Sequence, residues 1–367
     1  MPDSIPNPPS PSVNRHKLGV GVIGLGYWGP NLLRNFAENS DFELRWACDL
    51  REARLAAMKR RYPFLKTATA VEQVLDDPAV DAVVIATPVD THFKLATAAL
   101  RAGKHLLLEK PMTRTTAEAD SLLALAAAQK RVLMVDHTFL FTPAVRQIKQ
   151  RLEKGELGEL YFVDSVRINL GLIQRDVNVL WDLAPHDLSI ILHVLQRTPQ
   201  RVSAVGACHT RGGQADVAHL YLDFGGNLIA HIHSSWLSPV KVRQMVFGGS
   251  CRTLIYNDLE PTEKIRLYEA GVDLTEQDEA GIHNLLVSYR RGDILIPNLE
   301  LKEALANEME HFHACITQGA ACLTGGVFGR EIVRILETAD QSLREGRAQF
   351  TTASPPLTKS PTPGKGV

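Results

Sequence analysis

The chain has 367 residues, which is long for a single domain and favours two. Hydrophobic residues make up 45% of it and charged residues 22%, the balance of an ordinary globular protein. The formal net charge of −1 gives no electrostatic footprint for nucleic acid or for an anionic membrane, so both of these partners are excluded.

The two ends of the chain are rich in proline and serine. Residues 1–16 have no apolar core and predict a disordered leader, not a secretory signal, and residues 350–367 predict a disordered tail. No apolar run approaches the roughly 18 residues that a transmembrane helix needs. The five cysteines are scattered and include no CxxC pair, which indicates buried thiols in a reducing compartment, neither a disulfide framework nor a zinc site. We therefore expect a cytoplasmic protein.

Strands and helices alternate over residues 17–136. The strands are near-continuous apolar runs, as expected when helices cover both faces of a parallel sheet. The predicted strands are 18–24, 42–49, 79–87, 104–111 and 131–136, and the predicted helices are 30–38, 51–62, 91–103 and 115–130. This repetition predicts a doubly wound α/β domain of the Rossmann type.

The turn after the first predicted strand reads GLGYWG, a GxGxxG motif at Gly24, Gly26 and Gly29. It follows an apolar strand and opens a helix, the context in which glycines let a pyrophosphate approach the backbone and the helix N-terminus. We therefore expect this turn, including Tyr27 and Trp28, to bind a dinucleotide. The alternative is a glycine turn that binds no ligand.

Asp49 ends the second predicted strand, about 20 residues after Gly29. A carboxylate there accepts hydrogen bonds from the adenosine ribose and repels a 2′-phosphate, which favours NAD over NADP. Arg51 weakens this preference, because an arginine at that position could accept the phosphate. NAD is thus the expected cofactor, with NADP possible, and a helix-capping aspartate is the alternative for Asp49.

Two later strands end in the sequences ATPVDTH and LEKPM. Open α/β sheets bind ligands at the carboxyl ends of their strands, so we expect the cofactor beside these ends. The expected cofactor contacts are Thr87, Pro88, His92, Glu109 and Lys110. Lys110 is the sharpest of them, because the proline after it favours extended backbone and points it into the crevice. The alternative for Lys110 is a surface lysine whose stem lies on apolar neighbours.

After about residue 136 the pattern changes. One helix at 143–155 leads into alternating strands at 160–170, 200–210, 217–224, 227–237, 241–249 and 251–258. This pattern predicts an α+β domain over residues 137–349 with a large, open, mostly antiparallel sheet. We expect helices at 183–196, 303–317 and 330–345 to cover one face. Large apolar patches rarely stay exposed, so a homo-oligomer, a dimer or tetramer, is expected to bury the other face.

The stretch LWDLAPHDL places Asp182 and His186 four residues apart, on one face of a helix's first turn and among apolar neighbours. Oxidation of an alcohol needs a base for the hydroxyl proton, and the helix dipole keeps a histidine near a helix N-terminus neutral. The alternatives are a plain N-cap for Asp182 and a structural histidine for His186.

The glycine turn, Asp49, the ATP…H and EKP sequences and the Asp-x-x-x-His pair together resemble the glucose–fructose oxidoreductase/inositol dehydrogenase (Gfo/Idh/MocA) family over about residues 17–345. The resemblance implies a nicotinamide-dependent oxidoreductase with Lys110, Asp182 and His186 as a catalytic triad. We favour His186 as the proton acceptor, with Lys110 polarising the substrate oxygen. The stretches GYWGPNLLRNF and DVNVLWDLAPHDLSI further resemble members of nucleotide-sugar biosynthesis.

Polar residues on strand faces of the second domain are candidates for holding the substrate, because alternate residues of a strand share a face. The expected substrate contacts are Arg167, Asn169, Asn178, Lys241 and Arg243. They suit an acidic or phosphorylated substrate, and a solvated or intersubunit face is the alternative. Residues 288–294 are expected to form a surface loop.

His231 and His233 share a strand face, and with His209 and His219 they raise the alternative of a metal site. No acid–cysteine cluster accompanies them and hydride transfer needs no metal, so no metal is expected. The prediction is a two-domain NAD(P)-dependent oxidoreductase acting on a secondary hydroxyl or ketone of a sugar, by preference a nucleotide sugar. The alternatives are a dehydrogenase of free polyols such as inositols and a non-catalytic nicotinamide-sensing regulator.

Overall fold

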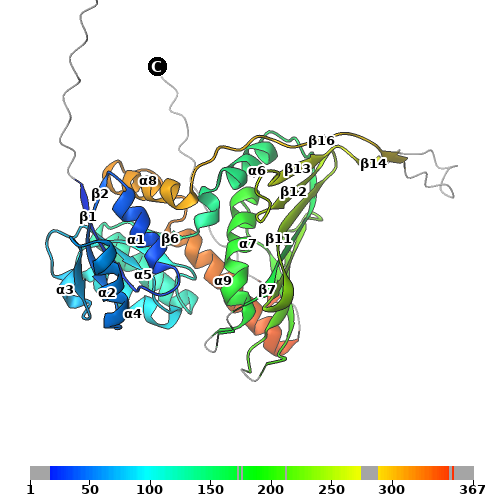
Figure 1. Ribbon diagram of the computed structural model, residues 1–367. Coiled ribbons are helices and arrows are strands. Elements are labelled where there is room, and N and C mark those ends of the chain that lie inside the picture. The colour runs from blue at the N-terminus through cyan, green and yellow to red at the C-terminus, as the bar shows by residue number, and fades with distance from the viewer. Residues whose placement is uncertain are drawn as a thin grey trace, which may run out of the picture.

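The computed structural model describes residues 17–171, 173–174, 177–210, 213–273, 288–346 and 349–350. The leader predicted at residues 1–16 lies outside the described residues, as does all but the first residue of the tail predicted at 350–367. Two large sheets, each with helices against it, make up most of the described chain (Figure 1).

The first domain is built on a six-stranded parallel sheet in the order β3-β2-β1-β4-β5-β6. Its strands are β1 (Leu18–Ile23), β2 (Phe42–Cys48), β3 (Lys66–Ala68), β4 (Ala82–Ile85), β5 (His105–Glu109) and β6 (Leu133–Asp136). Its helices are α1 (Gly29–Glu38), α2 (Glu52–Arg61), α3 (Glu72–Leu75), α4 (Val89–Arg101) and α5 (Thr116–Gln129). The strand order reverses between β1 and β4, and such a reversal opens a ligand crevice at the carboxyl ends of the strands. The predicted doubly wound fold is confirmed.

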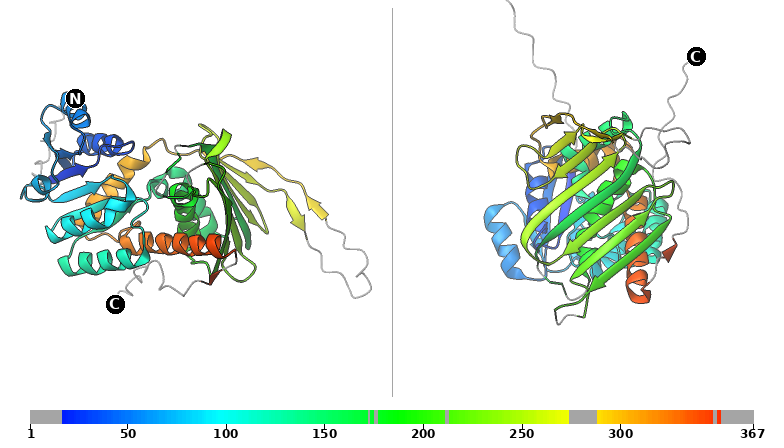
Figure 2. Two further views of the ribbon diagram at one scale, coloured as in Figure 1. Left: turned by 90° about the horizontal axis from the view of Figure 1, so that it is seen from below. Right: turned by 90° about the vertical axis from the view of Figure 1, so that its right-hand side faces the viewer.

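The second domain contains a nine-stranded sheet in the order β16-β13-β12-β11-β7-β10-β9-β8-β17. Its strands are β7 (Leu160–Leu170), β8 (Arg201–Ala207), β9 (Val217–Asp223), β10 (Ile229–Ser235), β11 (Leu237–Gly249), β12 (Thr253–Asn257), β13 (Ile265–Tyr268), β16 (Ile294–Leu295) and β17 (Gln349–Phe350). All neighbours are antiparallel except β7 and β10. The predicted mostly antiparallel sheet is therefore confirmed. None of the helices that the structure describes lies on its outer face (Figure 2, right).

A small ribbon projects from this sheet (Figure 1). It pairs β14 (Gly271–Asp273) with β15 (Ser288–Arg290). Part of the surface loop expected at residues 288–294 is thus a strand.

Five helical segments follow β6 in the described chain. They are η1 (Thr138–Phe141), α6 (Pro143–Glu153), α7 (Val179–Leu195), α8 (Ala304–Thr317) and α9 (Gly326–Glu345). α7 lies against the inner face of the large sheet and α9 packs on β8, as expected (Figure 1). The expectation was wrong for α8. This helix packs on the first domain, because its apolar side contacts α1 and β2. Phe312 stacks on Phe42 of β2, and Arg34 of α1 pairs with Glu303 at the start of α8.

α7 begins four residues before the predicted start of this helix at residue 183. The Asn178 side chain accepts the backbone N–H groups of Leu180 and Trp181 and so caps an earlier first turn. Pro185 consequently lies inside α7 and does not mark its start. Among the described helices, none combines the length and the apolar character that spanning a membrane requires.

Candidate active site

The glycine turn lies between β1 and α1, and its three glycines have different surroundings. A Cβ at Gly24, whose φ is +95°, would lie 2.4 Å from the Ala86 carbonyl oxygen, and a Cβ at Gly29 would lie 2.0 Å from the Gly24 carbonyl oxygen. A Cβ at Gly26 would meet nothing within 4 Å. α1 starts at Gly29 with no side-chain cap and no acidic residue in its first turn. The turn therefore fits a pyrophosphate, which needs close backbone approach and a helix N-terminus without competing negative charge.

Trp28 fixes this turn to the far side of the crevice. Its indole N–H donates to Asp136 Oδ2, at the end of β6, with a length of 2.8 Å. Tyr27 next to it is 87% exposed. Tyr27 is thus open to solvent beside the exposed backbone of Gly26.

Asp49 follows β2 and is held in its charged form. Its carboxylate accepts the backbone N–H of Leu25, inside the glycine turn, at 2.7 Å and that of Arg51 at 2.8 Å. Burial acts to raise the pKa of Asp49, but these two donors and the Arg54 guanidinium, 3.3 Å away, outweigh it and lower the pKa. The N-cap position of α2 is Arg51, which excludes the capping alternative for Asp49. Sequence reasoning considered Arg51 and missed Arg54, the arginine whose side chain contacts Asp49.

The loops after β4 and β5 are joined through His92, which is 1% exposed. Its Nε2 lies 2.8 Å from the carbonyl oxygen of Thr87, and its Nδ1 lies 3.0 Å from that of Pro111. Burial lowers the pKa of His92. The ring thus holds together the two loops that carry Thr87 and Lys110. Cofactor contacts from Thr87, Pro88 and His92 stay predictions.

Lys110, just after β5, meets Asp182 of α7. Its Nζ donates to the Asp182 backbone carbonyl at 2.7 Å and lies 3.6 Å from Asp182 Oδ1. Both side chains are partly exposed, at 15% and 21%. The other carboxylate oxygen, Oδ2, accepts the indole N–H of Trp236 at 2.9 Å. Two of the three predicted catalytic residues are therefore in contact across the two domains.

His186 lies one turn after Asp182, and its ring packs edge-on against Phe139 with the centroids 5.1 Å apart. Burial lowers the pKa of His186 well below its ordinary value, and the positive charge of Lys110 lowers it further. The ring is therefore neutral near pH 7, with one ring nitrogen unprotonated. Burial is the main cause, in place of the helix dipole expected from the sequence, because His186 lies beyond the first turn of α7.

The structural alternatives for the pair do not hold. Asn178, not Asp182, is the N-cap of α7. The Nδ1 atom of His186 is buried and has no hydrogen-bond partner among the residues that the structure describes, so the ring is not a satisfied structural histidine.

Three carboxyl groups gather around Lys110, of which Asp136 and Glu308 are buried and Glu109 is partly exposed. Glu109 and Asp136 are register partners at the ends of β5 and β6, and burial raises the pKa of both. Glu308 of α8 is fully buried, and burial followed by the nearby Asp136 raises its pKa well above the ordinary value. Sequence reasoning missed two of these groups. The position of Asp136 at a strand's carboxyl end was an available signal, whereas nothing in the sequence links Glu308 to this site.

Two of the predicted substrate contacts have partners inside the protein. The Arg167 guanidinium forms a two-bond ion pair with Asp187, with Nε 2.9 Å from Oδ2 and Nη2 2.9 Å from Oδ1, and both side chains are buried. It also lies over the Phe139 ring, 4.8 Å from the centroid. Asn178 caps α7 and donates to Asp340 at 2.7 Å. A substrate contact from Arg167 or Asn178 stays a prediction.

The other three candidates lie on β7 and β11. Arg243 is opposite Arg167 in the register, and its charge contributes to the lowered pKa of His186, which places it near the triad. Its Nη1 lies 3.3 Å from Asp258 Oδ2. Lys241 is exposed in the stretch where the β7–β11 register shifts, and Asn169 is half-buried on β7. Of the three, the structure therefore brings Arg243 close to His186.

The histidines weighed as metal ligands pack against one another or against an acid. The rings of His219 and His233 stack with centroids 4.3 Å apart, and His219 Nδ1 lies 3.0 Å from His231 Nε2. Their strand neighbours on either side are buried, so these rings lie on the outer face of the sheet, opposite α7. His209 Nδ1 is 2.8 Å from Asp216.

A turn that fits a pyrophosphate can bind a dinucleotide. A neutral histidine beside a lysine can transfer a proton to or from a hydroxyl group. A protein with both is a dinucleotide-dependent oxidoreductase. Residues 18–137 match the oxidoreductase family with an NAD-binding Rossmann fold, and residues 145–254 match the GFO/IDH/MocA C-terminal domain. The chain belongs to the Gfo/Idh/MocA family of oxidoreductases.

The chain is similar to several curated relatives. It is 29% identical over 341 residues to the UDP-N-acetylglucosamine 3-dehydrogenase of Acidithiobacillus ferrooxidans. This match covers 86% of this chain and 94% of that protein. It is 30% identical over 260 residues to the uncharacterized oxidoreductase YdgJ of Escherichia coli, covering 67% of this chain and 73% of YdgJ. It is 24% identical to the myo-inositol 2-dehydrogenase of Thermotoga maritima, covering 90% and 98% of the two chains.

Solved structures agree with this assignment. The structure of the Acidithiobacillus ferrooxidans UDP-N-acetylglucosamine 3-dehydrogenase matches with a TM-score of 0.74 and 27% identity, over 90% of this chain and 98% of that one. The predicted family, fold class and NAD(P)-dependent dehydrogenase chemistry on CH–OH groups are confirmed.

Proposed function

We propose that the protein transfers a hydride between nicotinamide and a secondary hydroxyl or ketone of a nucleotide-linked sugar, with Lys110, Asp182 and His186 as catalytic residues. The observation that carries the proposal is the contact of Lys110 Nζ with Asp182, one helical turn from a neutral His186. The two domains both contribute to this group, so the reacting carbon would lie at their junction.

The catalytic residues divide the work of alcohol oxidation. NAD⁺, or NADP⁺, held by the glycine turn and Asp49, would accept the hydride. His186 takes the hydroxyl proton at Nε2, because its ring is neutral and its Nδ1 is buried. Lys110 donates a hydrogen bond to the same oxygen and stabilises its developing negative charge. Asp182 holds the Lys110 ammonium group in place, and in the reverse reaction His186 returns the proton to the ketone oxygen.

Two features support a nucleotide sugar as the substrate. One is the similarity to a UDP-N-acetylglucosamine 3-dehydrogenase over most of both chains. The other is the pair of cations on β11, Lys241 and Arg243, of which Arg243 lies near His186 and has a buried Nε with no hydrogen-bond partner among the described residues. A diphosphate offers such cations charge-assisted hydrogen bonds.

The first test is NADH formation from NAD⁺ with a panel of UDP-sugars, their uronates and free polyols. Wild type is run beside Lys110→Ala and His186→Ala, with the exposed Lys94→Ala as the control. We expect turnover of one UDP-sugar, reduced at least about 100-fold in both site variants and unchanged in the control. Turnover that survives both substitutions would place the chemistry elsewhere.

A dehydrogenase of free polyols is the second candidate, because relatives include inositol dehydrogenases. Charge separates the two. Arg243→Met and Lys241→Met should raise KM strongly for a UDP-sugar and little for a neutral inositol. Turnover of inositols alone, insensitive to both changes, would favour the polyol enzyme.

A nicotinamide-sensing regulator is the remaining alternative. The group of Lys110, Asp182 and His186 argues against it, because a sensor that performs no chemistry has no need of a proton acceptor. Tight NADH binding without turnover of any member of the panel would favour the sensor.

We also propose that the chain assembles as a homo-oligomer through the outer face of the nine-stranded sheet, which none of the described helices covers (Figure 2, right). Apolar side chains on that face are exposed, among them Val205 at 65%, Tyr221 at 50% and Ile229 at 56%. Light scattering on wild type and Ile229→Lys tests it. We expect a dimer or larger for wild type and a smaller species for the variant.

A further inference from the structure

Three side chains that bind soft metal ions meet where α8 ends. His311 and Cys315 lie one turn apart on α8, and Cys322 follows on the loop before α9. The imidazole nitrogen and the two sulfur atoms lie within 4.8 Å of one another. The sequence predicts no zinc site here, because Cys315 and Cys322 are seven residues apart and form no CxxC pair.

The spacing of these atoms suits one tetrahedral ion. With Zn–S bonds of about 2.3 Å and Zn–N bonds of about 2.0–2.1 Å, neighbouring ligand atoms lie roughly 3.5–3.8 Å apart. Cys315 Sγ lies 3.5 Å from His311 Nε2. The same Nε2 atom accepts the backbone N–H of Leu323 at 2.9 Å, so its lone pair is in use in the metal-free protein and an ion would replace that bond.

Both sulfur atoms lie close enough to the imidazole to share one ion with it. A bound cation would hold them as thiolates, the form in which cysteine binds metal ions.

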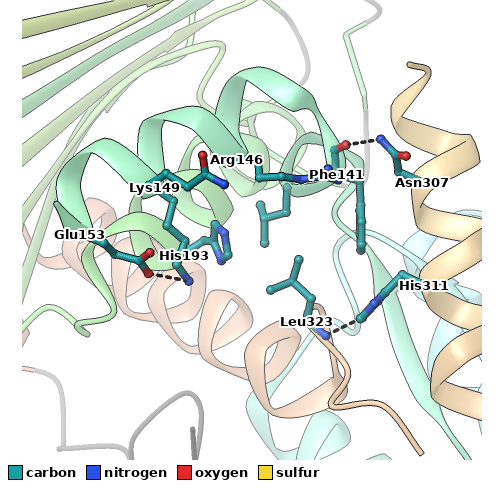
Figure 3. Close-up of a pocket in the computed structure, with 10 residues that line it drawn as sticks. Phe141, Arg146, Lys149, Glu153, His193, Asn307, His311 and Leu323 are labelled. Atoms are coloured by element: carbon teal, nitrogen blue, oxygen red, sulfur yellow. Dashed lines mark hydrogen bonds and ion pairs between the residues drawn. The ribbon is translucent and has the colours of Figure 1, made fainter. Parts of the chain in front are cut away.

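A cavity borders this group at His311, and neither cysteine is among its lining residues. It has a volume of about 350 Å³, lies between α6, α7 and α8, and is lined by His311 and Leu323 on one side and by Lys149 and His193 on the other (Figure 3). A cavity of this size holds several waters. A water from it can supply the fourth ligand, as in zinc sites with three protein ligands.

We propose that His311, Cys315 and Cys322 form a binding site for a soft divalent cation, Zn²⁺ in the first place, with a water as the fourth ligand. The ion would clamp residues 318–325 to the end of α8. That loop is bonded to β6, because the Thr324 carbonyl accepts the Val135 N–H at 2.8 Å and Gly325 bridges to Met134. The site thus braces the strand that ends at Asp136, without taking part in the hydride transfer.

The test uses the full chain, reduced and stripped of metal, and titrates it with Co²⁺. We expect one equivalent to bind, with a thiolate-to-cobalt charge-transfer band in the near ultraviolet and the visible bands of a tetrahedral ion, and Zn²⁺ to displace it. Cys322→Ser and His311→Gln should each weaken Zn²⁺ binding by at least about 100-fold, since even changes to groups around a metal's ligands cost about 10–100-fold. The matched controls are Cys251→Ser, an exposed thiol, and His313→Gln, on the same helix.

A second measurement needs no variant. Zn²⁺ should protect Cys315 and Cys322 from alkylation in the native protein, while Cys208 and Cys251 stay reactive, as read by peptide mass spectrometry. The proposal is overturned if the reduced protein binds no Co²⁺, if the band persists without Cys315 and Cys322, or if Zn²⁺ protects neither thiol. It is also overturned if the two sulfurs prove to be joined in a disulfide in the native protein and the reduced protein binds no metal.

Discussion

The indole of Trp236 and the carboxylate of Asp182 share a hydrogen bond, Nε1 to Oδ2 at 2.9 Å, which leaves Oδ1 as the oxygen that faces Lys110. Trp236 lies between β10 and β11 and is 1% exposed. The large sheet thereby orients a carboxylate on α7, and through it the ammonium group of a lysine from the other domain. Trp236 is a positioning residue in this arrangement.

Trp236→Phe keeps an aromatic ring but removes the N–H donor. A hydrogen bond to a charged group is worth about 1.5–3 kcal/mol, so we expect kcat to fall by about 10-fold or more while KM changes little. Trp46→Phe removes a comparable bond, to Asp77 at 2.7 Å, far from the site and serves as the control. Equal losses of kcat in the two variants, or a loss confined to KM, would show that Trp236 does not act through Asp182.

Gly26→Ala separates the fold of the glycine turn from its binding function. The new methyl group meets nothing within 4 Å, so the melting temperature should stay unchanged. It would stand in the path of the pyrophosphate, and overpacking of about 1–3 kcal/mol corresponds to NADH binding weakened by roughly 5- to 150-fold. Gly29→Ala, with a Cβ 2.0 Å from the Gly24 carbonyl oxygen, should instead lower the melting temperature. NADH fluorescence titration and thermal unfolding measure the two effects, and wild-type NADH affinity in Gly26→Ala would place the pyrophosphate elsewhere.

Removing one member of the buried ion pair of Arg167 and Asp187 should lower the free energy of unfolding strongly. Replacing both members by apolar residues should lower it little. Asp187→Ala leaves the guanidinium buried without its partner and should lower the free energy of unfolding by about 3–5 kcal/mol. The double variant Arg167→Met/Asp187→Leu should recover most of this loss. Urea unfolding measures both, and a double variant as unstable as Asp187→Ala would contradict the reasoning.

His193 should make the fold sensitive to acid. Burial, with the charge of Lys149, lowers its pKa to about 4 in the folded protein, whereas in the unfolded chain it titrates near its ordinary value of about 6.5. The unfolded chain therefore binds the proton first, so stability is present above about pH 6.5 and is lost as the pH falls towards about 4. The loss amounts to about 1.4 kcal/mol per pH unit in that window. Urea unfolding of wild type and His193→Leu between about pH 7 and about pH 5 checks it, and parallel pH dependences would count against it.

The parts of the site that follow a strand could be predicted from the sequence. Gly24, Asp49 and Lys110 come directly after β1, β2 and β5, and in a parallel sheet all such positions gather at one edge. The local sequence pattern thus predicts which residues lie close together, because the fold repeats one strand–helix unit.

The parts that come from distant elements could not be predicted. Trp236 reaches Asp182 because α7 lies on the large sheet, and Glu308 approaches Asp136 because α8 packs on the first domain. Cys322 meets Cys315 because the loop after α8 returns to that helix. No periodicity in the chain encodes such pairs. The start of α7 was predicted wrongly for a local reason. Pro185 favoured a start near residue 183, whereas the helix begins at Val179, where the Asn178 side chain caps it.

The strand order has a consequence for redesign. Asp49, the proposed partner of the adenosine ribose, follows β2, and Lys110, the proposed group at the reacting end, follows β5. With β1 and β4 between them, the two strands share no backbone hydrogen bonds. Energetic effects at such separated sites usually add. Cofactor preference should therefore be separable from catalysis in this fold. Exchanging Asp49 and Arg54 for residues that accept a phosphate should change the preference between NAD and NADP and leave kcat with the preferred cofactor unchanged.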